Sequence, residues 1–293
     1  MSWLIAGCGD LGTEVGLRAA AAGHTVYGLR RSADRLPAPI RPLAGDLGGD
    51  LPDLPGDVEV VVSAAAPDTR DAAAYRRSYL DGPQRLLDAL ERADAPVARV
   101  LLVSSTAVYD VHDGSWVDET TPTGPGSAAG AGTATRPASP NAAVLVEAEQ
   151  ALWSRRPDAI SLRLAGIYGP GRTRLVDQVR AGRAVRPDPP VHANRIHRDD
   201  AAAAVVHLLT AVSASATCYL GVDDAPVDRG EVIAFLAAEL GVPTPPVGPD
   251  QRSRGGDKRC RNNRLRATGF TLRYPTYREG YRALLAGRGV RHS

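Results

Sequence analysis

Residues 3–12 of the 293-residue chain read WLIAGCGDLG, an apolar run that leads directly into a glycine-rich turn. Gly7, Gly9 and Gly12 follow the spacing G-x-G-x-x-G, and a helical pattern begins immediately after them. Between a strand and a helix, the first glycine permits a tight turn, the second lets a pyrophosphate approach the backbone, and the third lets the helix pack on the strand. The helix N-terminus then faces the phosphates, so this turn predicts a dinucleotide site.

The end of the next expected strand indicates which dinucleotide would bind. An NAD-binding protein places a carboxylate there for the adenine ribose hydroxyls, but this chain has Arg30 and Arg31. Two guanidiniums can pair with the 2′-phosphate of NADP in bidentate fashion. The sequence therefore predicts NADP rather than NAD as the cofactor.

Further cofactor contacts are expected along the same edge of the sheet, where small or polar residues follow the strands. The alternative to a dinucleotide site is a related fold that keeps the glycine turn but no longer binds a ligand. The predicted contacts are Asp10 and Leu11 within the glycine turn, Asp46 and Leu47 in a later turn beside the adenine, and Ala64, Ala65 and Ala66 after a strand end over which the cofactor would pass.

Short apolar runs alternate with helical patterns from the first residue onward, as in a parallel sheet with helices on both faces. The run Val60-Val61-Val62 is unbroken rather than alternating, as expected for a strand buried on both faces. We therefore predict an α/β fold, a Rossmann-type doubly wound parallel sheet with a smaller C-terminal substrate-binding region. The expected strands cover residues 3–6, 25–29, 58–63, 100–104 and 159–164, and the expected helices cover 14–22, 75–92, 143–153, 199–211, 229–240 and 277–285.

The predicted division is an NADP-binding domain at residues 1–164, to which 193–222 return, and a smaller, mixed α/β substrate-binding region at 165–293. Residues 120–140 are dominated by Gly, Ala, Ser, Thr and Pro and cannot build a core, so we expect a loop there. Its position after a strand end predicts either a lid over the site or a surface insertion without a role.

Composition and charge argue against several classes of protein. Hydrophobic residues make up 43% of the chain and charged residues 23%, as is typical of globular proteins. The formal net charge is only +2 and basic residues are spread among acidic ones, so nucleic-acid binding is not expected. Cys8, Cys218 and Cys260 lie far apart without metal-binding spacing, and no apolar run is long enough to span a membrane. We expect a cytoplasmic monomer or homodimer that binds a small-molecule substrate.

Three further motifs give the chain a family resemblance. Residues 104–109 read SSTAVY, residues 162–172 read LRLAGIYGPGR, and residues 194–200 read NRIHRDD. Together with the glycine turn, they make the chain resemble the extended and atypical short-chain dehydrogenase/reductases, the NAD-dependent epimerase/dehydratase-like family. The resemblance covers nearly the whole chain and implies that Ser104 lies beside the cofactor and that Tyr168 shapes the nicotinamide pocket.

The usual catalytic pair of that family is missing from this chain. In the family, a Tyr and a Lys four residues apart on a helix act as the acid/base pair, and the resemblance places those positions at Asn141 and Leu145. An amide cannot ionise near neutral pH, and a leucine can neither bind a ribose hydroxyl nor lower the pKa of a neighbour. Since Lys258 is the single lysine of the chain, no Tyr-x-x-x-Lys exists elsewhere.

Acid/base chemistry would then depend on other residues. The resemblance places Ser105 where the carbonyl-orienting hydroxyl belongs, although it could instead cap a strand end. Tyr109 lies in a loop at the carboxyl end of a strand, where ligands bind in doubly wound sheets, although its ring could instead serve packing. Asp81 resembles an acidic residue of the atypical subgroup and is the third candidate. His197, at a helix start, is expected to pack or to cap.

Three functions are consistent with these residues. The first is an NADP(H)-dependent reductase or epimerase that delegates protonation to Ser105, Tyr109 or water. The second is a non-redox lyase, cyclase or isomerase that keeps the cofactor as a scaffold. The third is a non-catalytic NADP-binding sensor.

Overall fold

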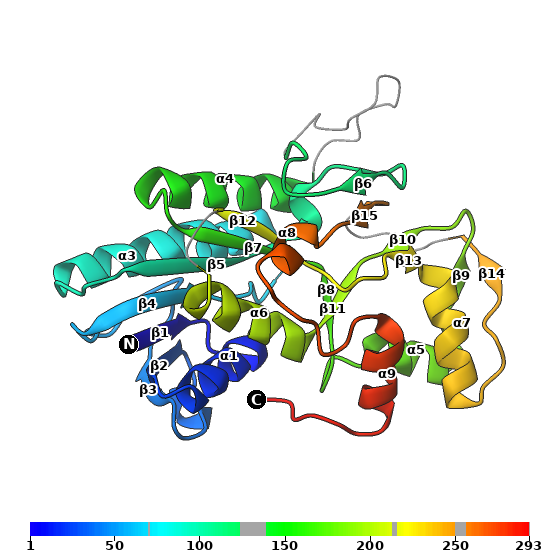
Figure 1. Ribbon diagram of the computed structural model, residues 1–293, viewed down its shortest axis with the longest axis horizontal. Helices are drawn as coiled ribbons and strands as arrows, with labels where there is room; N and C mark the ends of the chain where they lie inside the picture. Colours follow the sequence, from blue (N-terminus) through cyan, green and yellow to red (C-terminus); the bar gives the residue numbers. More distant parts are fainter. Residues whose placement is uncertain (70, 124–138, 213–215, 250–255, 293) are drawn as a thin grey trace.

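The computed structural model describes residues 1–69, 71–123, 139–212, 216–249 and 256–292. Its centre is a seven-stranded sheet in the order β12-β7-β5-β4-β1-β2-β3, in which all neighbouring strands are parallel (Figure 1). The predicted Rossmann-type doubly wound α/β fold is confirmed. The strands are β1 (Ser2–Ala6), β2 (Thr25–Arg30), β3 (Arg41–Ala44), β4 (Val58–Ser63), β5 (Arg99–Ser105), β7 (Ile160–Leu164) and β12 (Cys218–Gly221).

Helices cover both faces of this sheet, as Figure 1 shows. On one face lie α1 (Asp10–Ala21) and α6 (Arg198–Thr210), and on the other α3 (Gly82–Arg92) and α4 (Pro140–Arg155). Alternate residues of β1 enter the two layers, because Trp3 and Ile5 pack under α1 and α6 whereas Leu4 packs under α3 and α4. Burial on both faces explains why these strands are continuous apolar runs.

Most of the remaining elements lie at the carboxyl ends of the strands. A separate hydrophobic cluster is built mainly from α5 (Arg174–Arg180), α7 (Arg229–Leu240) and α9 (Tyr277–Leu285). The strand β8 (Gly166–Tyr168) pairs in parallel with β11 (Arg195–His197). The other short elements are α2 (Ala72–Tyr75), α8 (Asn263–Ala267), β6 (Trp116–Val117) with β15 (Arg259–Cys260), β9 (Arg186–Pro187) with β14 (Val247–Gly248), and β10 (His192–Ala193) with β13 (Val227–Asp228).

The chain returns to the central sheet after β11, because α6 packs beside α1 and β12 extends the sheet next to β7. We therefore propose the division predicted above, with residues 1–164 and 193–222 forming the nucleotide-binding part and the rest of 165–293 the smaller part. Most of the loop expected at 120–140 lies outside the described residues, so its role as a lid stays a prediction.

The long helix expected at 75–92 is present without a break, but it is not α-helical throughout. It consists of α2, a π-helical segment (Arg76–Asp81) and α3, which begins at Gly82 with Pro83 in its first turn. Such π-helical turns widen the helix locally and are frequent at functional sites. The apolar periodicity of α3 is regular, so the sequence predicted a helix but gave no indication of the wider turn before it.

A buried ion pair joins α4 to β7, the strand next to the β12 edge of the sheet. Arg163 on β7 donates from Nε and Nη2 to the carboxylate of Glu149 at 2.7–3.2 Å, and from Nη1 to the Tyr109 hydroxyl at 2.7 Å. The side chains of Arg163 and Glu149 are only 4% and 1% exposed. The two charges satisfy each other inside the protein, where either one alone would be poorly solvated.

The substitution Glu149→Ala should therefore destabilise the protein strongly, because it leaves the Arg163 guanidinium buried without a counter-charge. We expect the free energy of unfolding, measured by urea denaturation, to fall by about 3–5 kcal/mol. Glu147→Ala is the matched control on the same helix, since the Glu147 side chain is 49% exposed in its pair with Arg76. It should change stability little. Equal losses in the two variants would contradict the importance of the buried pair.

Candidate cofactor cleft and active site

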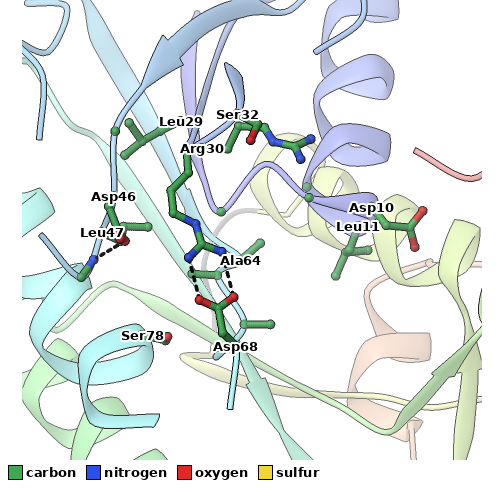
Figure 2. Close-up of a pocket in the computed structure, with 18 of the residues that line it drawn as sticks. Asp10, Leu11, Leu29, Arg30, Ser32, Asp46, Leu47, Ala64, Asp68 and Ser78 are labelled. Atoms are coloured by element: carbon green, nitrogen blue, oxygen red, sulfur yellow. Dashed lines mark hydrogen bonds and ion pairs between the residues drawn. The ribbon is translucent and has the colours of Figure 1, made fainter. Parts of the chain in front are cut away.

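A cleft of about 380 Å³ opens at the carboxyl ends of β1, β2 and β4 (Figure 2). It brings together residues that are far apart in the sequence, as expected where parallel strands end at one edge of a sheet. Most of the predicted cofactor contacts line it. These are Gly7, Gly9, Asp10, Leu11, Gly12, Arg30, Arg31, Asp46, Leu47, Ala64, Ala65 and Ala66.

The three glycines of the turn have different surroundings. Gly7 has φ +83°, and a Cβ there would lie 2.3 Å from the backbone nitrogen of Ala65. A Cβ on Gly12 would lie 2.7 Å from the carbonyl oxygen of Gly7, so these two glycines are required by the turn itself. A Cβ on Gly9 would meet nothing within 4 Å. The open space beside Gly9 is where a phosphate could approach the backbone, so the turn fits a dinucleotide.

The N-terminus of α1 carries a carboxylate that is neutralised by arginines. Asp10 accepts hydrogen bonds from Arg172 Nε at 2.8 Å and from Arg198 Nη1 at 2.8 Å. The backbone N–H of His292 also donates to it at 3.2 Å, which holds the C-terminal residues against the turn. Because two guanidiniums offset the charge of Asp10, the helix end can still attract phosphate groups.

Arg31, the second of the strand-end arginines, faces a carboxylate across the cleft. Arg31 donates from Nη1 and Nη2 to the two carboxylate oxygens of Asp68 at 2.6 and 2.8 Å, an ion pair drawn as dashed lines in Figure 2. This contact lowers the pKa of Asp68 and raises that of Arg31. The two side chains are 66% and 61% exposed, so the pair is a weak surface contact that a ligand could replace.

The turn after β3 is organised by Asp46. The backbone N–H of Gly48 donates to Asp46 Oδ1 at 2.8 Å, and the carbonyl oxygen of Leu47 accepts from Arg85 Nη2 at 2.7 Å. Figure 2 shows Asp46 and Leu47 on the side of the cleft opposite Asp10. This places the turn where the adenine end of a dinucleotide would lie if its phosphates face α1.

Several cleft residues were not predicted from the sequence. Arg77 and Ser78 enter it from the π-helical segment, and Arg172 reaches it from the loop after β8. Asp68 also lines it. Arg172 is part of the family-like motif at 162–172, which could have indicated it. The wider turn that directs Arg77 and Ser78 has no signal in the sequence.

The two serines at the end of β5 differ in their contacts. Ser104 is 4% exposed, and among the described residues its hydroxyl has no hydrogen-bond partner. Ser105 Oγ accepts from the backbone N–H of Ala107 at 3.2 Å and caps the short turn that follows. Neither residue lines the cleft. Because the Ser105 hydroxyl accepts in this contact, its proton remains able to donate to another group.

Tyr109, a predicted catalytic residue, contacts Arg163 in the protein interior. Its side chain is 2% exposed, its hydroxyl accepts from Arg163, and it does not line the cleft. Burial raises the pKa of the phenol despite the nearby guanidinium. The contact with Arg163 gives the ring a place in the core, and its catalytic role stays a prediction.

Two other predicted positions lie apart from the cleft. Asp81 ends the π-helical segment with its side chain 43% exposed, and its carboxylate lies 3.9 Å from Arg76 Nε. Leu145, at the position of the family's lysine, is 2% exposed and packs beside Tyr109. A buried apolar side chain therefore occupies the position where the family has a positive charge.

Tyr168 lies in the hydrophobic cluster built from α5, α7 and α9 and does not line the cofactor cleft. It is 4% exposed, stacks on Tyr281 with ring centroids 4.4 Å apart, and contacts His197 edge to face. His197 Nδ1 accepts from the N–H of Asp199 and caps α6, as the sequence predicted, and burial lowers the pKa of its ring to about 4. His197 is therefore neutral near pH 7.

A parallel sheet, a glycine turn at the first strand and an open helix N-terminus together define a Rossmann-type nucleotide-binding protein. The sequence profile of the NAD dependent epimerase/dehydratase family matches residues 3–219. The chain belongs to this family, and the resemblance drawn from its motifs is confirmed. Membership of this family supports a nucleotide cofactor for the chain.

Solved structures resemble this chain over its whole length. A candidate NAD-dependent epimerase/dehydratase from Methylobacillus flagellatus is 34% identical, with a TM-score of 0.76 and 98% of each chain covered. A conserved protein of unknown function from Silicibacter pomeroyi is 30% identical, with a TM-score of 0.78 and the same coverage. The UDP-glucose 4-epimerase of Thermus thermophilus, solved with NAD, is 19% identical with a TM-score of 0.77 and 98% of each chain covered, and supports the fold alone.

No curated protein matches the chain. Within the part of the chain that the structure describes, no helix has both the length and the apolar character needed to cross a membrane.

The space beside Gly9 gives a direct test of the cleft. Gly9→Ala should fold normally, because φ at this position is −84° and the new methyl group meets no protein atom. It should nevertheless weaken dinucleotide binding by about tenfold or more, since the methyl group would occupy the space that a phosphate needs. Calorimetric titration with NAD and NADP measures the effect.

Gly49→Ala is the matched control, because its Cβ would make only an ordinary contact, 3.8 Å from Asp46 Cβ, and Gly49 does not line the cleft. Unchanged affinity in both variants would show that no phosphate lies against Gly9.

Proposed function

We propose that the protein is an NADP(H)-dependent reductase or epimerase that acts on a small molecule without the Tyr/Lys pair. The observation that carries this proposal is the pair Arg30 and Arg31 at the carboxyl end of β2, where both line the cleft. A guanidinium pair supplies bidentate donors for a phosphate dianion and no acceptor for ribose hydroxyls. The 2′-phosphate of NADP is the group that matches.

When NADP binds, its 2′-phosphate would replace Asp68 as the partner of Arg31. A phosphate dianion carries more charge than the exposed Asp68 carboxylate and can take its place at the guanidinium. The opposing possibility is that Asp68 itself accepts hydrogen bonds from the ribose of NAD. Because the two possibilities assign opposite roles to Asp68, substitutions there distinguish them.

The residues around the cleft suggest how a reaction would proceed. A bound nicotinamide cofactor supplies hydride transfer. Ser105 is the group that we assign to orient the substrate, because its hydroxyl proton can donate to a carbonyl oxygen while Oγ accepts from Ala107. With Leu145 in place of a lysine, proton transfer passes to the Ser105 hydroxyl or to water. Binding and orientation then account for most of the acceleration.

A second candidate is a non-redox lyase, cyclase or isomerase that keeps the dinucleotide as a scaffold. It is favoured by the contact of the Tyr109 hydroxyl with Arg163, which directs this candidate acid away from the cleft. We also propose that the protein acts in the cytoplasm, in keeping with its free, buried cysteines, Cys8, Cys218 and Cys260.

Cofactor preference should respond to both members of the Arg31–Asp68 pair. Arg30→Ala combined with Arg31→Ala should weaken NADP binding by about tenfold or more and NAD binding little, because only NADP carries the 2′-phosphate.

Asp68→Asn should strengthen NADP binding, because the neutral amide no longer competes with the 2′-phosphate for the Arg31 guanidinium. Affinities are measured by calorimetry. Arg35→Ala is the control, since Arg35 is exposed and does not line the cleft.

A loss of NAD binding in Asp68→Asn with no gain for NADP would contradict the proposal and assign Asp68 to the ribose.

The role of Ser105 can be tested in turnover. With NADPH and a panel of small carbonyl compounds, absorbance at about 340 nm should fall as the cofactor is oxidised. Ser105→Ala should reduce this rate by about tenfold or more without changing the affinity for NADPH, because the hydroxyl contacts the substrate and not the cofactor. Full activity in the variant would return Ser105 to a capping role, and turnover without a change in absorbance would favour the non-redox candidate.

A further inference from the structure

The residues that follow α9 form a short strap along the beginning of α1. Helix α9 ends at Leu285, and residues 288–292, called the strap below, cross from there to the N-terminal end of α1, as Figure 1 shows. The last segment of the described chain therefore lies against the helix whose N-terminus faces the cofactor cleft.

Hydrogen bonds join the strap to the first turns of α1 and to the start of α6. The backbone N–H of His292 donates to Asp10 Oδ1 at 3.2 Å, and its ring Nε2 lies 2.8 Å from Glu14 Oε2. The carbonyl oxygen of Val290 accepts from Arg198 Nη2 at 2.6 Å. Arg198 is 1% exposed, so this carbonyl satisfies a donor of a buried guanidinium.

The strap also packs on the loop after β8. Gly289 has φ +92°, and a Cβ there would lie 2.6 Å from Pro170 Cγ. A Cβ on Gly171 would overlap the side chain of Arg291. Arg172 comes next in this loop, lines the cofactor cleft and makes an ion pair with the first residue of α1. The strap therefore supports the two segments that this ion pair joins.

The strap lies outside the cleft and not across it. Among the residues that the structure describes, the lining of the cleft includes Asp10 and Arg172 but none of residues 288–292. A dinucleotide in the cleft would therefore meet residues that the strap holds, and would not have to displace the strap.

The strap changes the charge that a phosphate would meet at the start of α1. Asp10 and Glu14 lie near the positive end of the helix, where their carboxylates compete with an anionic ligand. With the strap in place, Asp10 accepts an additional N–H and Glu14 has a partner in the His292 ring. Both contacts are lost when the strap leaves. A phosphate is therefore bound more favourably while the strap is docked.

We propose that residues 288–292 are a positioning element of the cofactor site, and that docking of the strap and binding of a dinucleotide strengthen each other. This inference rests on the proposed function, because it takes the ligand of the cleft to be a dinucleotide. Asp10 carries the effect, since it lines the cleft and accepts from the strap. Such coupling is reciprocal, so the factor by which docking raises the affinity equals the factor by which the dinucleotide favours docking.

The first measurement compares dinucleotide affinity in the full-length chain and in a chain that ends at Gly287. Calorimetric titration with NADP and with NAD should give a Kd about fivefold higher or more in the shortened chain. His292→Ala should raise the Kd in the same direction, because the ring no longer contacts Glu14.

Val290→Ala is the matched control on the same strap. Val290 is 68% exposed, and its contact with Arg198 uses the backbone carbonyl, which the variant keeps. The Kd should stay unchanged in this variant.

The second measurement follows the strap itself, by hydrogen exchange of the C-terminal peptide detected by mass spectrometry. Saturation with the dinucleotide should slow this exchange about fivefold or more, because the bound nucleotide favours the docked form. Without nucleotide, His292→Ala should speed the exchange and Val290→Ala should leave it unchanged.

Equal or tighter affinity in the shortened chain, or exchange of the strap that saturating dinucleotide does not slow, would overturn the coupling. If NAD binds and NADP does not, the proposed cofactor fails while the coupling is measured with NAD in its place. If neither binds to the full-length chain, the proposed cofactor and the coupling fail together. Docking is tested separately in the nucleotide-free protein, where equally fast exchange in the wild type and His292→Ala would contradict it.

Discussion

The close approach of the first strand's turn to the end of β4 is the constraint on which the site depends. Gly7 lies so near Ala65 that no side chain fits between them, and both residues line the cleft. The same turn begins α1 and leaves the backbone at Gly9 open to a ligand. Every group assigned to the cofactor is positioned relative to this turn, either on the next strand ends or on loops that close over them.

Charge is distributed around the turn in a way that favours an anionic ligand. Asp10 would oppose a phosphate, but Arg172 and Arg198 hold it, and the C-terminal residues add the N–H of His292. Arg172 lies in the loop after β8 and also lines the cofactor cleft. The C-terminal part of the chain thus contributes to a site whose glycine turn is formed by the first twelve residues.

The sequence predicted the sheet and the cofactor edge well because both depend on local signals. Continuous apolar strands and a glycine turn are visible in short windows, whereas β3 is mostly exposed and gave no such run. Side-chain direction was not predictable: Tyr109 follows a strand end as a ligand-binding residue would, yet its hydroxyl is held inside by Arg163. The pairing of Arg31 with Asp68 likewise depends on strand order, which brings the ends of β2 and β4 together on either side of β1.

The replacement of the family's lysine by the buried Leu145 means that cofactor placement, rather than a tuned acid/base pair, is central to the function proposed for this chain. The most direct measurement is a crystal structure grown with NADP at millimolar concentration. We expect pyrophosphate density beside Gly9 at the start of α1, and the 2′-phosphate against Arg30 and Arg31. A cleft without nucleotide under these conditions, or a nucleotide bound elsewhere, would contradict the assignment of this cleft to NADP.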